Sequence, residues 1–262
     1  MARVGRISTT VNNVTTTIPV GAFSTDGGTT WARFATTPAA ASSSAGSSIA
    51  VSADGATLIW DTPANTRATP PAAGGPQFSR DHGATWTASA GIGAIRPVFA
   101  DRVNPSKFYG YDGAMGRLYV STDGGATFAL AAPVSTALRG TGRPRATPGI
   151  EGDVWLVTTA GLSHSVDSGV TFAPVPAATA TVALGQGKAA PGKTYPALYL
   201  IGTANQAAGI YRSDDTGATW TRIDDAQHLW ATAVTLTGDP RLYGRVYVGT
   251  NGRGILYGDM AP

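Results

Sequence analysis

The segment STDGGTTW, residues 24–31, recurs four more times along the chain, and this recurrence decides the fold class. The other copies are SRDHGATW (79–86), STDGGATF (121–128), SVDSGVTF (165–172) and SDDTGATW (213–220). All five fit the pattern Ser-x-Asp-x-Gly-x-Thr-Trp/Phe. Successive copies start 55, 42, 44 and 48 residues apart, which is about the length of one four-stranded propeller blade. The spacing predicts an all-β propeller.

The repeat has the composition of a tight turn between two strands. Ser24 and Asp26 can bind backbone amides of the turn, and Gly28 supplies a positive φ that a Cβ would penalise. Thr30 and Trp31 then begin the next strand, where the ring can pack between sheets. We therefore interpret the repeat aspartates as structural rather than catalytic: Asp26, Asp81, Asp123, Asp167 and Asp215.

Strand-like segments around each repeat place it between the third and fourth strands of a blade. This phasing predicts about 22 strands, almost no helix, and one propeller domain over residues 1–262. The expected blades are 1–36, 37–90, 91–132, 133–176, 177–224 and 225–262. The first blade lacks its inner strand and the last lacks its outer strand. We expect either a contracted ring or a homodimer joined through these incomplete blades.

The composition agrees with a folded β protein. Charged residues are 13% of the chain, and 34 Gly and 17 Pro favour short strands and turns over long helices. Hydrophobic residues reach 42%, with 6 Trp, 9 Tyr and 7 Phe, which argues against disorder. A helical bundle or coiled coil is excluded.

Charge and cysteine usage exclude several classes of function. The net charge of +3 comes from dispersed Arg and Lys residues, so no nucleic-acid partner is expected. The absence of Cys removes thiolate metal sites, and the three His residues lie far apart in the sequence, so no metal or cofactor is expected. No apolar run of membrane-spanning length is present, and MARVGRISTT lacks the apolar core of a signal peptide. As written, the chain is expected to be soluble and mature.

Several longer segments carry a resemblance to a known family. They are IAVSADGATLIW (49–60), ADRVNPSKFYGYD (100–112), GIEGDVWL (149–156), GKAAPGKTYPALYLIGT (187–203), YRSDDTGATWTRIDDAQHLW (211–230) and GDPRLYGRVYVGTNGRGILYGD (238–259). From Arg3 onward the chain resembles the C-terminal half of glycoside hydrolase family 74, the xyloglucanases and oligoxyloglucan hydrolases. The repeat resembles the Asp box of that family, of sialidases and of sortilin-type receptors.

The resemblance implies two tandem seven-bladed propellers that hydrolyse plant cell-wall β-1,4-glucans with inversion, and a secreted, extracellular location. One catalytic Asp comes from each propeller in that family. The two segments that carry them, Thr-Asp-x-Gly-Gly near the family's N-terminus and Gly-Asp-x-Gly-Gly-Phe, have no counterpart here. Asp26 and Asp123 lie in repeat turns, so the catalytic role is not transferred to them.

We expect a ligand to bind on one face of the predicted propeller. This face is formed by the loops that join the second to the third strand of each blade and the fourth strand to the first strand of the next blade. Glycoside hydrolysis needs two carboxyl groups, about 6.5 to 9.5 Å apart for inversion or about 5 to 5.5 Å for retention. The catalytic candidates on this face are Asp61, Asp112, Asp224 and Asp225. The alternative is a strand-end cap for the first two and a solvated loop for the last two.

Sugars stack on aromatic rings and hydrogen-bond through their hydroxyls. On that basis the candidates for substrate binding are Trp60, Tyr111, Gln227, His228, Trp230 and Arg253. His228 could instead brace its loop, and Trp60 and Trp230 could instead be core. The other four Trp residues are expected in the core.

Two classes of function stay open. The first is a short xyloglucanase-type hydrolase that uses the candidate aspartates. The second is a non-catalytic β-glucan-binding propeller, or a fragment whose partner propeller completes the active site. A sortilin-like protein-binding propeller is a weaker third alternative.

Overall fold

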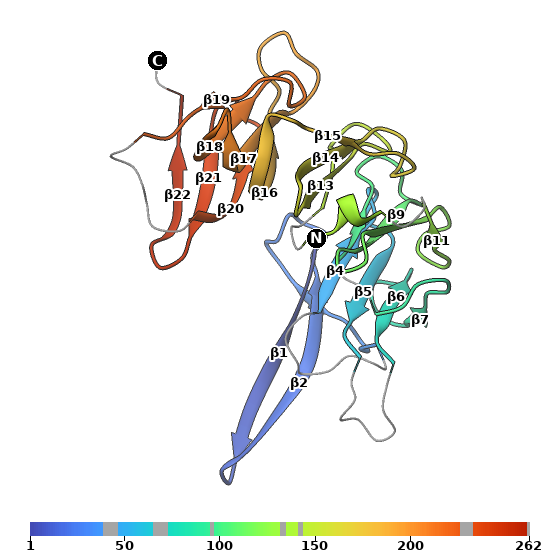
Figure 1. Ribbon diagram of the computed structural model, residues 1–262. Helices are drawn as coiled ribbons and strands as arrows, with labels where there is room; N and C mark the ends of the chain where they lie inside the picture. Colours follow the sequence, from blue (N-terminus) through green and yellow to red (C-terminus); the bar gives the residue numbers. More distant parts are fainter. Residues whose placement is uncertain are drawn as a thin grey trace. The chain divides into compact units, whose positions relative to one another are not determined.

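The computed structural model describes residues 1–38, 47–64, 73–94, 97–131, 135–140, 144–225 and 233–260. These residues form 22 strands in six antiparallel sheets, and one 3₁₀ turn, η1 (Thr136–Leu138) (Figure 1). The chain divides into two compact units, each containing three sheets. No helix in this part of the chain is long and apolar enough to cross a membrane.

The first unit comprises Met1–Asp112, Arg117–Pro133 and Gly149–Glu151. Its first sheet contains β1 (Ala2–Val11), β2 (Val14–Phe23) and β3 (Ala32–Arg33). The second contains β4 (Ser48–Val51), β5 (Leu58–Thr62), β6 (Gly75–Ser79) and β7 (Thr87–Ala88), in that order. The third contains β8 (Val98–Ala100), β9 (Phe108–Asp112), β10 (Arg117–Ser121) and β11 (Ala129–Leu130).

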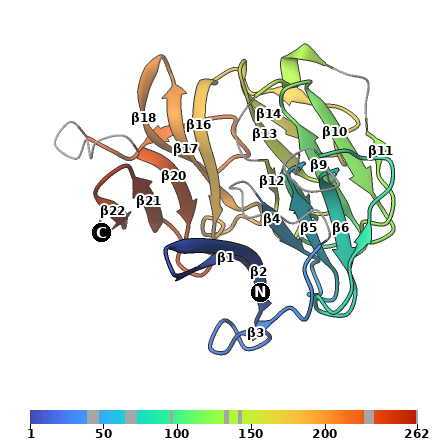
Figure 2. The same ribbon diagram turned by 90° about the horizontal axis from the view of Figure 1, so that it is seen from below.

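The second unit comprises Gly113–Gly116, Val134–Pro148 and Gly152–Pro262. Its first sheet contains β12 (Arg145–Ala146), β13 (Val154–Thr158), β14 (Gly161–Ser165) and β15 (Ala173–Pro174). The next contains β16 (Ala178–Gly187), β17 (Ala197–Ala204), β18 (Ala207–Ser213) and β19 (Thr221–Arg222). The last contains β20 (Ala233–Gly238), β21 (Val246–Thr250) and β22 (Gly254–Gly258), and Figure 2 shows each sheet from below.

Each eight-residue repeat joins the third strand of a four-stranded sheet, or the second strand of the first sheet, to a two-residue outer strand. In the copy at 79–86, the Ser79 hydroxyl donates to Asp81 (2.8 Å) and accepts from the Gly83 amide (2.8 Å). The amide and hydroxyl of Thr85 then donate to the Asp81 carboxylate at 2.9 and 2.6 Å. Gly83 has a φ of +84°. The turn is thus closed by side chains of its own repeat.

The cores lie between adjacent sheets of a unit. In the first unit, Ile59 and Phe78 of the second sheet pack against Phe108 and Phe128 of the third. The corresponding core of the second unit includes Trp155, Leu162, Leu198, Tyr211 and Trp220. In both cases the aromatic residue of a repeat, Phe128 or Trp220, is buried against the preceding sheet.

The first sheet extends beyond the predicted strands. The strand-like segments RVGRIS (3–8) and VGAFS (20–24) predict short strands, whereas β1 and β2 pair over ten residues each, from Ala2↔Phe23 to Val11↔Val14. Asn12 and Asn13, with φ of 49° and 60°, form the two-residue connection. Two consecutive positive φ values fit the right-handed twist of a hairpin, and Asn tolerates them better than most residues.

Candidate functional site

Trp60 lies in the core, which corrects its predicted role as a sugar-stacking residue. It is the third residue of β5 and is 0% exposed. Its ring lies 5.6 Å from that of Trp86, edge to face, and 6.0 Å from that of Phe34. A ring that is enclosed by two other aromatic side chains has no free face for a sugar.

The neighbouring candidates of the first unit are also largely withdrawn from solvent. Asp61 is the fourth residue of β5, a strand buried along its whole length, and is 0% exposed; Tyr111 on β9 is 1% exposed. Burial, and secondly the carboxylate of Asp112, raise the pKa of Tyr111 to about 12. Asp61 and Tyr111 therefore do not contact substrate as they are placed here. Asp112, the last residue of β9, is half-buried and is the accessible carboxylate of this group.

Asp224 and Asp225 follow β19 in the second unit. Asp224 accepts hydrogen bonds from the Arg222 guanidinium (2.8 Å) and from the Ile210 amide (3.0 Å). Burial acts to raise the pKa of Asp224, but these bonds hold it below its usual value. An anchored, ionised carboxylate is unsuited to donate a proton. Asp225 is exposed.

Both residues line a cavity of about 590 Å³. Its lining is mainly apolar and includes Ile210, Ile223, Val246 and Val248. Asp259 also lines the cavity and is held by Arg245 through two hydrogen bonds of 2.7 and 2.8 Å. The cavity thus combines apolar side chains with three carboxylates.

The remaining candidates lie elsewhere. Arg253 is exposed in the turn between β21 and β22, and its amide donates to the Thr250 hydroxyl (3.1 Å). Gln227, His228 and Trp230 fall in 226–232, outside the described residues. Of the catalytic candidates, Asp61 and Asp112 belong to the first unit, and Asp224 and Asp225 to the second.

The repeat aspartates have the electrostatics of structural groups. Hydrogen bonds from the Thr85 hydroxyl, the Thr85 amide and the Ser79 hydroxyl lower the pKa of Asp81 to about 2. The pKa is also lowered in the other four copies, at Asp26, Asp123, Asp167 and Asp215. A carboxyl group with such a pKa stays ionised near neutral pH and is a poor general acid.

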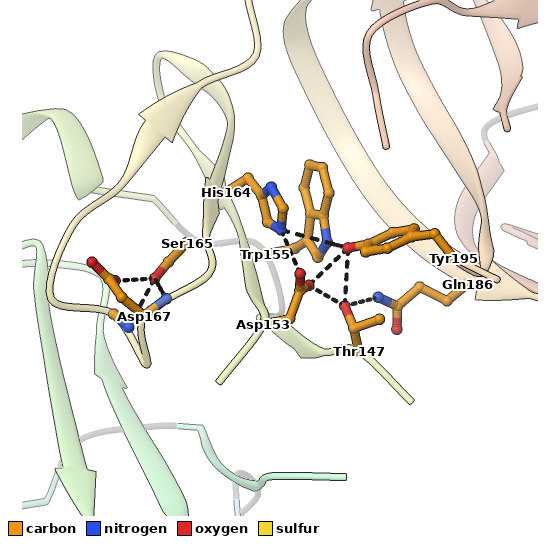
Figure 3. Close-up of polar contacts among 9 residues, drawn as sticks. Thr147, Asp153, Trp155, His164, Ser165, Asp167, Gln186 and Tyr195 are labelled. Carbon is orange, nitrogen blue, oxygen red and sulfur yellow. Dashed lines mark hydrogen bonds and ion pairs between the residues drawn. The ribbon is translucent and has the colours of Figure 1, made fainter. Parts of the chain in front are cut away.

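A polar cluster around Asp153 is the most connected group of side chains that sequence reasoning missed (Figure 3). The Asp153 carboxylate, 3% exposed, faces His164 Nε2 at 2.9 Å. It also accepts from the hydroxyls of Thr147 (2.5 Å) and Tyr195 (2.7 Å). The Trp155 indole donates to Tyr195 (2.8 Å), and its ring stacks on His164 with 3.8 Å between centroids.

This cluster joins two sheets of the second unit. Thr147, Asp153, Trp155 and His164 belong to the sheet β12–β15 or its turns, whereas Tyr195 precedes β17 and Gln186, which donates to Thr147 (2.7 Å), lies on β16. Burial acts to raise the pKa of Asp153, but the bonds from His164, Thr147 and Tyr195 hold it below its usual value. The cluster is therefore a brace between sheets that keeps a buried carboxylate ionised. The signal available in the sequence was a single histidine, His164, in the strand-like segment GLSHS (161–165).

Within the described ranges, no group of three or more His, Asp or Glu side chains is placed to hold a metal ion. Asp112, Asp225 and Arg253 reach solvent, whereas Asp153 and Asp224 are held by hydrogen bonds within the fold.

Comparisons with known proteins point to one family, although no family model matches the chain. A xyloglucanase of a Paenibacillus species is 43% identical over 242 residues, which are 90% of this chain and 22% of that protein. The xyloglucanase Xgh74A of Acetivibrio thermocellus is 42% identical over 91% of this chain and 27% of its own length. The solved xyloglucanase of Xanthomonas campestris, of glycoside hydrolase family 74, superposes with a TM-score of 0.77 at 36% identity, covering 93% of this chain and 33% of its own.

The chain thus spans between 22% and 33% of the length of these relatives. The sequence identity and the superposition extend over nine-tenths of its residues. The chain belongs to glycoside hydrolase family 74 and corresponds to a part of the length of its members.

Proposed function

We propose that this chain acts on xyloglucan or a related β-1,4-glucan of the plant cell wall, outside the cell, as a glycoside hydrolase-like propeller. The observation that carries the proposal is the 43% identity over 90% of the chain to a protein named xyloglucanase. Because the chain covers only 22% of that relative, its role within the whole activity is part of the proposal.

In this proposal the six sheets are the blades of a single propeller, with incomplete end blades, and the five repeats are Asp boxes. The order of strands within each sheet supports it, since consecutive strands pair antiparallel and each repeat closes the outermost hairpin. The Asp boxes stabilise blades and take no part in hydrolysis, in keeping with the lowered pKa of their carboxyl groups.

The structure favours weak hydrolysis by this chain at most. Glycoside hydrolysis, whether inverting or retaining, needs two carboxyl groups, one protonated and one ionised. Of the four candidates, Asp61 is fully buried and Asp224 is anchored by Arg222. Asp112 and Asp225 remain as the groups that could reach a glucan, together with the exposed Arg253.

A second function, glucan binding without cleavage, is favoured by the burial of Asp61 and the anchoring of Asp224. Binding needs exposed polar and aromatic groups but no acid and base with separated pKa values. The two functions predict different outcomes when the purified chain is incubated with xyloglucan, cellulose and mixed-linkage glucan.

The experiment follows reducing ends and retention by the insoluble polysaccharide in the same samples. Release of reducing ends that Asp112→Asn or Asp225→Asn lowers supports hydrolysis. Retention without release supports binding alone. Neither release nor retention on any glucan overturns the proposal.

A further inference from the structure

The hairpin of β1 and β2 is longer than the central hairpin of the other two sheets of the first unit. In those sheets the hairpin starts at the Ser of a repeat and has five residue pairs, counted from Ser79↔Leu58 and from Ser121↔Phe108. In the first sheet ten pairs precede the repeat. Because all three hairpins start beside a repeat, the additional pairs lie at the end away from the repeats.

The additional length begins where the catalytic candidates of this unit lie. Counted from the repeat, Asp61 is in the fourth pair of its hairpin and Asp112 in the fifth. In the first hairpin the last five pairs run from Ile7↔Ile18 to Val11↔Val14, and at 3.4 Å per residue they add roughly 17 Å. We call this segment, residues 7–18, the arm, and Figure 1 shows the hairpin extending past β4 and β5 of its own unit.

The base of the arm is fixed in the core of the first unit. Val4 and Phe23 pack with Leu58 and Trp60 of the second sheet. Gly21 lies so close to this core that a Cβ there would overlap the Phe34 ring. A two-stranded hairpin is only marginally stable by itself, so this anchored base holds the register of the arm.

The composition of the arm is that of an uncharged polar surface. Its sequence, ISTTVNNVTTTI, has no charged residue, and six of the twelve residues carry a hydroxyl and two carry an amide. Thr10 and Thr15 are exposed, and their hydroxyls lie 2.9 Å apart across the two strands. Asn12 and Asn13 are exposed in the turn. The arm thus presents hydrogen-bonding groups without any fixed charge.

The Thr hydroxyls are also held in place before a ligand arrives. A β-branched side chain has few rotamers on a strand, and the bond between Thr10 and Thr15 restricts these two further. Little side-chain entropy is therefore lost when such groups bind a ligand. Ile18, 50% exposed, adds apolar surface to the same hairpin.

We infer that the arm binds a β-1,4-glucan chain, with the Thr10 and Thr15 hydroxyls and the turn amides as its hydrogen-bonding groups. The inference rests on the proposed function and adds a binding surface to it. Hydroxyls and amides both donate and accept, as the hydroxyls of a sugar require. An acidic polysaccharide or a nucleic acid would find no cation on residues 7–18 to pair with.

The first test removes the two hydroxyls and keeps the hairpin. In the double variant Thr10→Val, Thr15→Val both residues stay β-branched and keep a high strand propensity. Binding to xyloglucan is measured by affinity electrophoresis of the full chain. We expect the apparent Kd to rise at least about fivefold, because about two neutral hydrogen bonds are lost.

Thr87→Val is the matched control in the same unit. Thr87 is exposed on the two-residue strand β7, beside a repeat and away from the arm. This substitution should leave the Kd for xyloglucan unchanged. Circular dichroism and thermal melting verify that the control and the double variant are folded.

The second test locates the bound glucan directly. The chain has six Asn residues, so selective ¹⁵N labelling of asparagine gives few backbone amide signals. Adding a xyloglucan oligosaccharide should shift the signals of Asn12 and Asn13. The signal of Asn104, in the turn between β8 and β9, should stay in place.

The outcomes separate this inference from the proposed function. If the unchanged chain binds xyloglucan, an unchanged Kd in the double variant, an equal rise in Thr87→Val, or unshifted Asn12 and Asn13 signals overturns the inference alone. No binding by the unchanged chain overturns both. Light scattering covers another occupant: self-association that the double variant abolishes would show that a second copy of the chain, rather than a glucan, binds the arm.

Discussion

His164 on β14 and Asp153, which directly precedes β13, form a nearly buried pair with 2.9 Å between Nε2 and Oδ2, and the His164 ring lies flat on Trp155. The pair is held from the adjacent sheet by Tyr195, whose hydroxyl bonds the same carboxylate at 2.7 Å. Hydrogen bonds to charged groups are stronger than neutral ones, so the bond from Tyr195 to Asp153 is a principal polar contact between the two sheets.

Removing the charge of this carboxylate should lower stability. Asp153→Asn keeps the size of the side chain but loses an acceptor oxygen and the negative charge that His164 faces. We expect the free energy of unfolding to fall by about 1.5–3 kcal/mol, the range for a hydrogen bond to a charged group. Urea denaturation measures it, with Asp225→Asn as a control at an exposed position. Equal stability of the two variants would contradict the bracing role.

The same residue predicts part of the pH dependence of stability. The pKa of Asp153 is lower in the folded chain than in an unfolded one. Its contribution is therefore fully present above the unfolded carboxyl pKa, about 3.9, and is lost as the pH falls through the lower folded value. Denaturation at several pH values should show a shallower loss of stability on the acid side for Asp153→Asn than for the unchanged chain.

Trp60 and Trp31 should differ in their importance for stability. Trp60→Ala removes a fully buried ring from a cluster with Phe34 and Trp86 and should cost about 3–5 kcal/mol. Trp31 is half-buried and lies under the Arg3 guanidinium at 4.4 Å, so Trp31→Ala should cost less. Thermal melts of the two variants rank them, and the reverse order would refute the assignment of Trp60 to the core.

Substitutions at two glycines of the repeats should distinguish the stability cost of backbone strain from that of close packing. Gly125 has a φ of +83°, and a Cβ there would overlap the side chain of Ile59. Gly27 has a φ of +73°, but a Cβ would meet nothing within 4 Å. Gly27→Ala should therefore cost about 1 kcal/mol from conformation alone, and Gly125→Ala should cost more. Similar losses in chemical denaturation would show that Ile59 moves aside freely.

A series of Asn substitutions tests the catalytic candidates. If the chain hydrolyses xyloglucan, Asp112→Asn and Asp225→Asn should reduce the rate, whereas Asp81→Asn should leave the rate per folded molecule unchanged. The reason is access: Asp112 and Asp225 reach solvent, and the Asp81 oxygens are occupied by Ser79 and Thr85. Reducing-end release, normalised to the folded fraction, measures it. Full activity in all three variants would place the catalytic group elsewhere.

The turns and the strands around the repeats were predictable because each repeat contains the groups that close it. The full length of the hairpin of β1 and β2 was not predicted, although the Asn12-Asn13 pair between Thr-rich segments is a hairpin signal, because no repeat marks its turn. Local patterns of this kind say where a strand begins and ends. They carry no information on which neighbouring sheet will cover it.

The candidate site was less predictable because its burial depends on contacts between sheets, which local patterns do not reveal. Trp60 and Asp61 stand at the end of a second strand, where a ligand face was expected, yet both are fully buried. The burial of Trp60 depends on Phe34 of the preceding sheet, a contact between residues 26 positions apart. The Asp153 cluster likewise assembles from Thr147, His164 and Tyr195, whose spacing in the sequence has no period.

The hydrogen bonds that the Ser and Asp side chains of the first repeat accept from turn amides span four residues at most, from Ser24 to Gly28 and from Asp26 to Thr30. The same bonds recur in the last copy, from Ser213 to Gly217 and from Asp215 to Thr219. A gene duplication that copies these eight codons therefore transmits a complete turn, whatever sequence surrounds it. Selection can then alter the long connections at the opposite ends of the strands without disturbing the hairpins that it has multiplied.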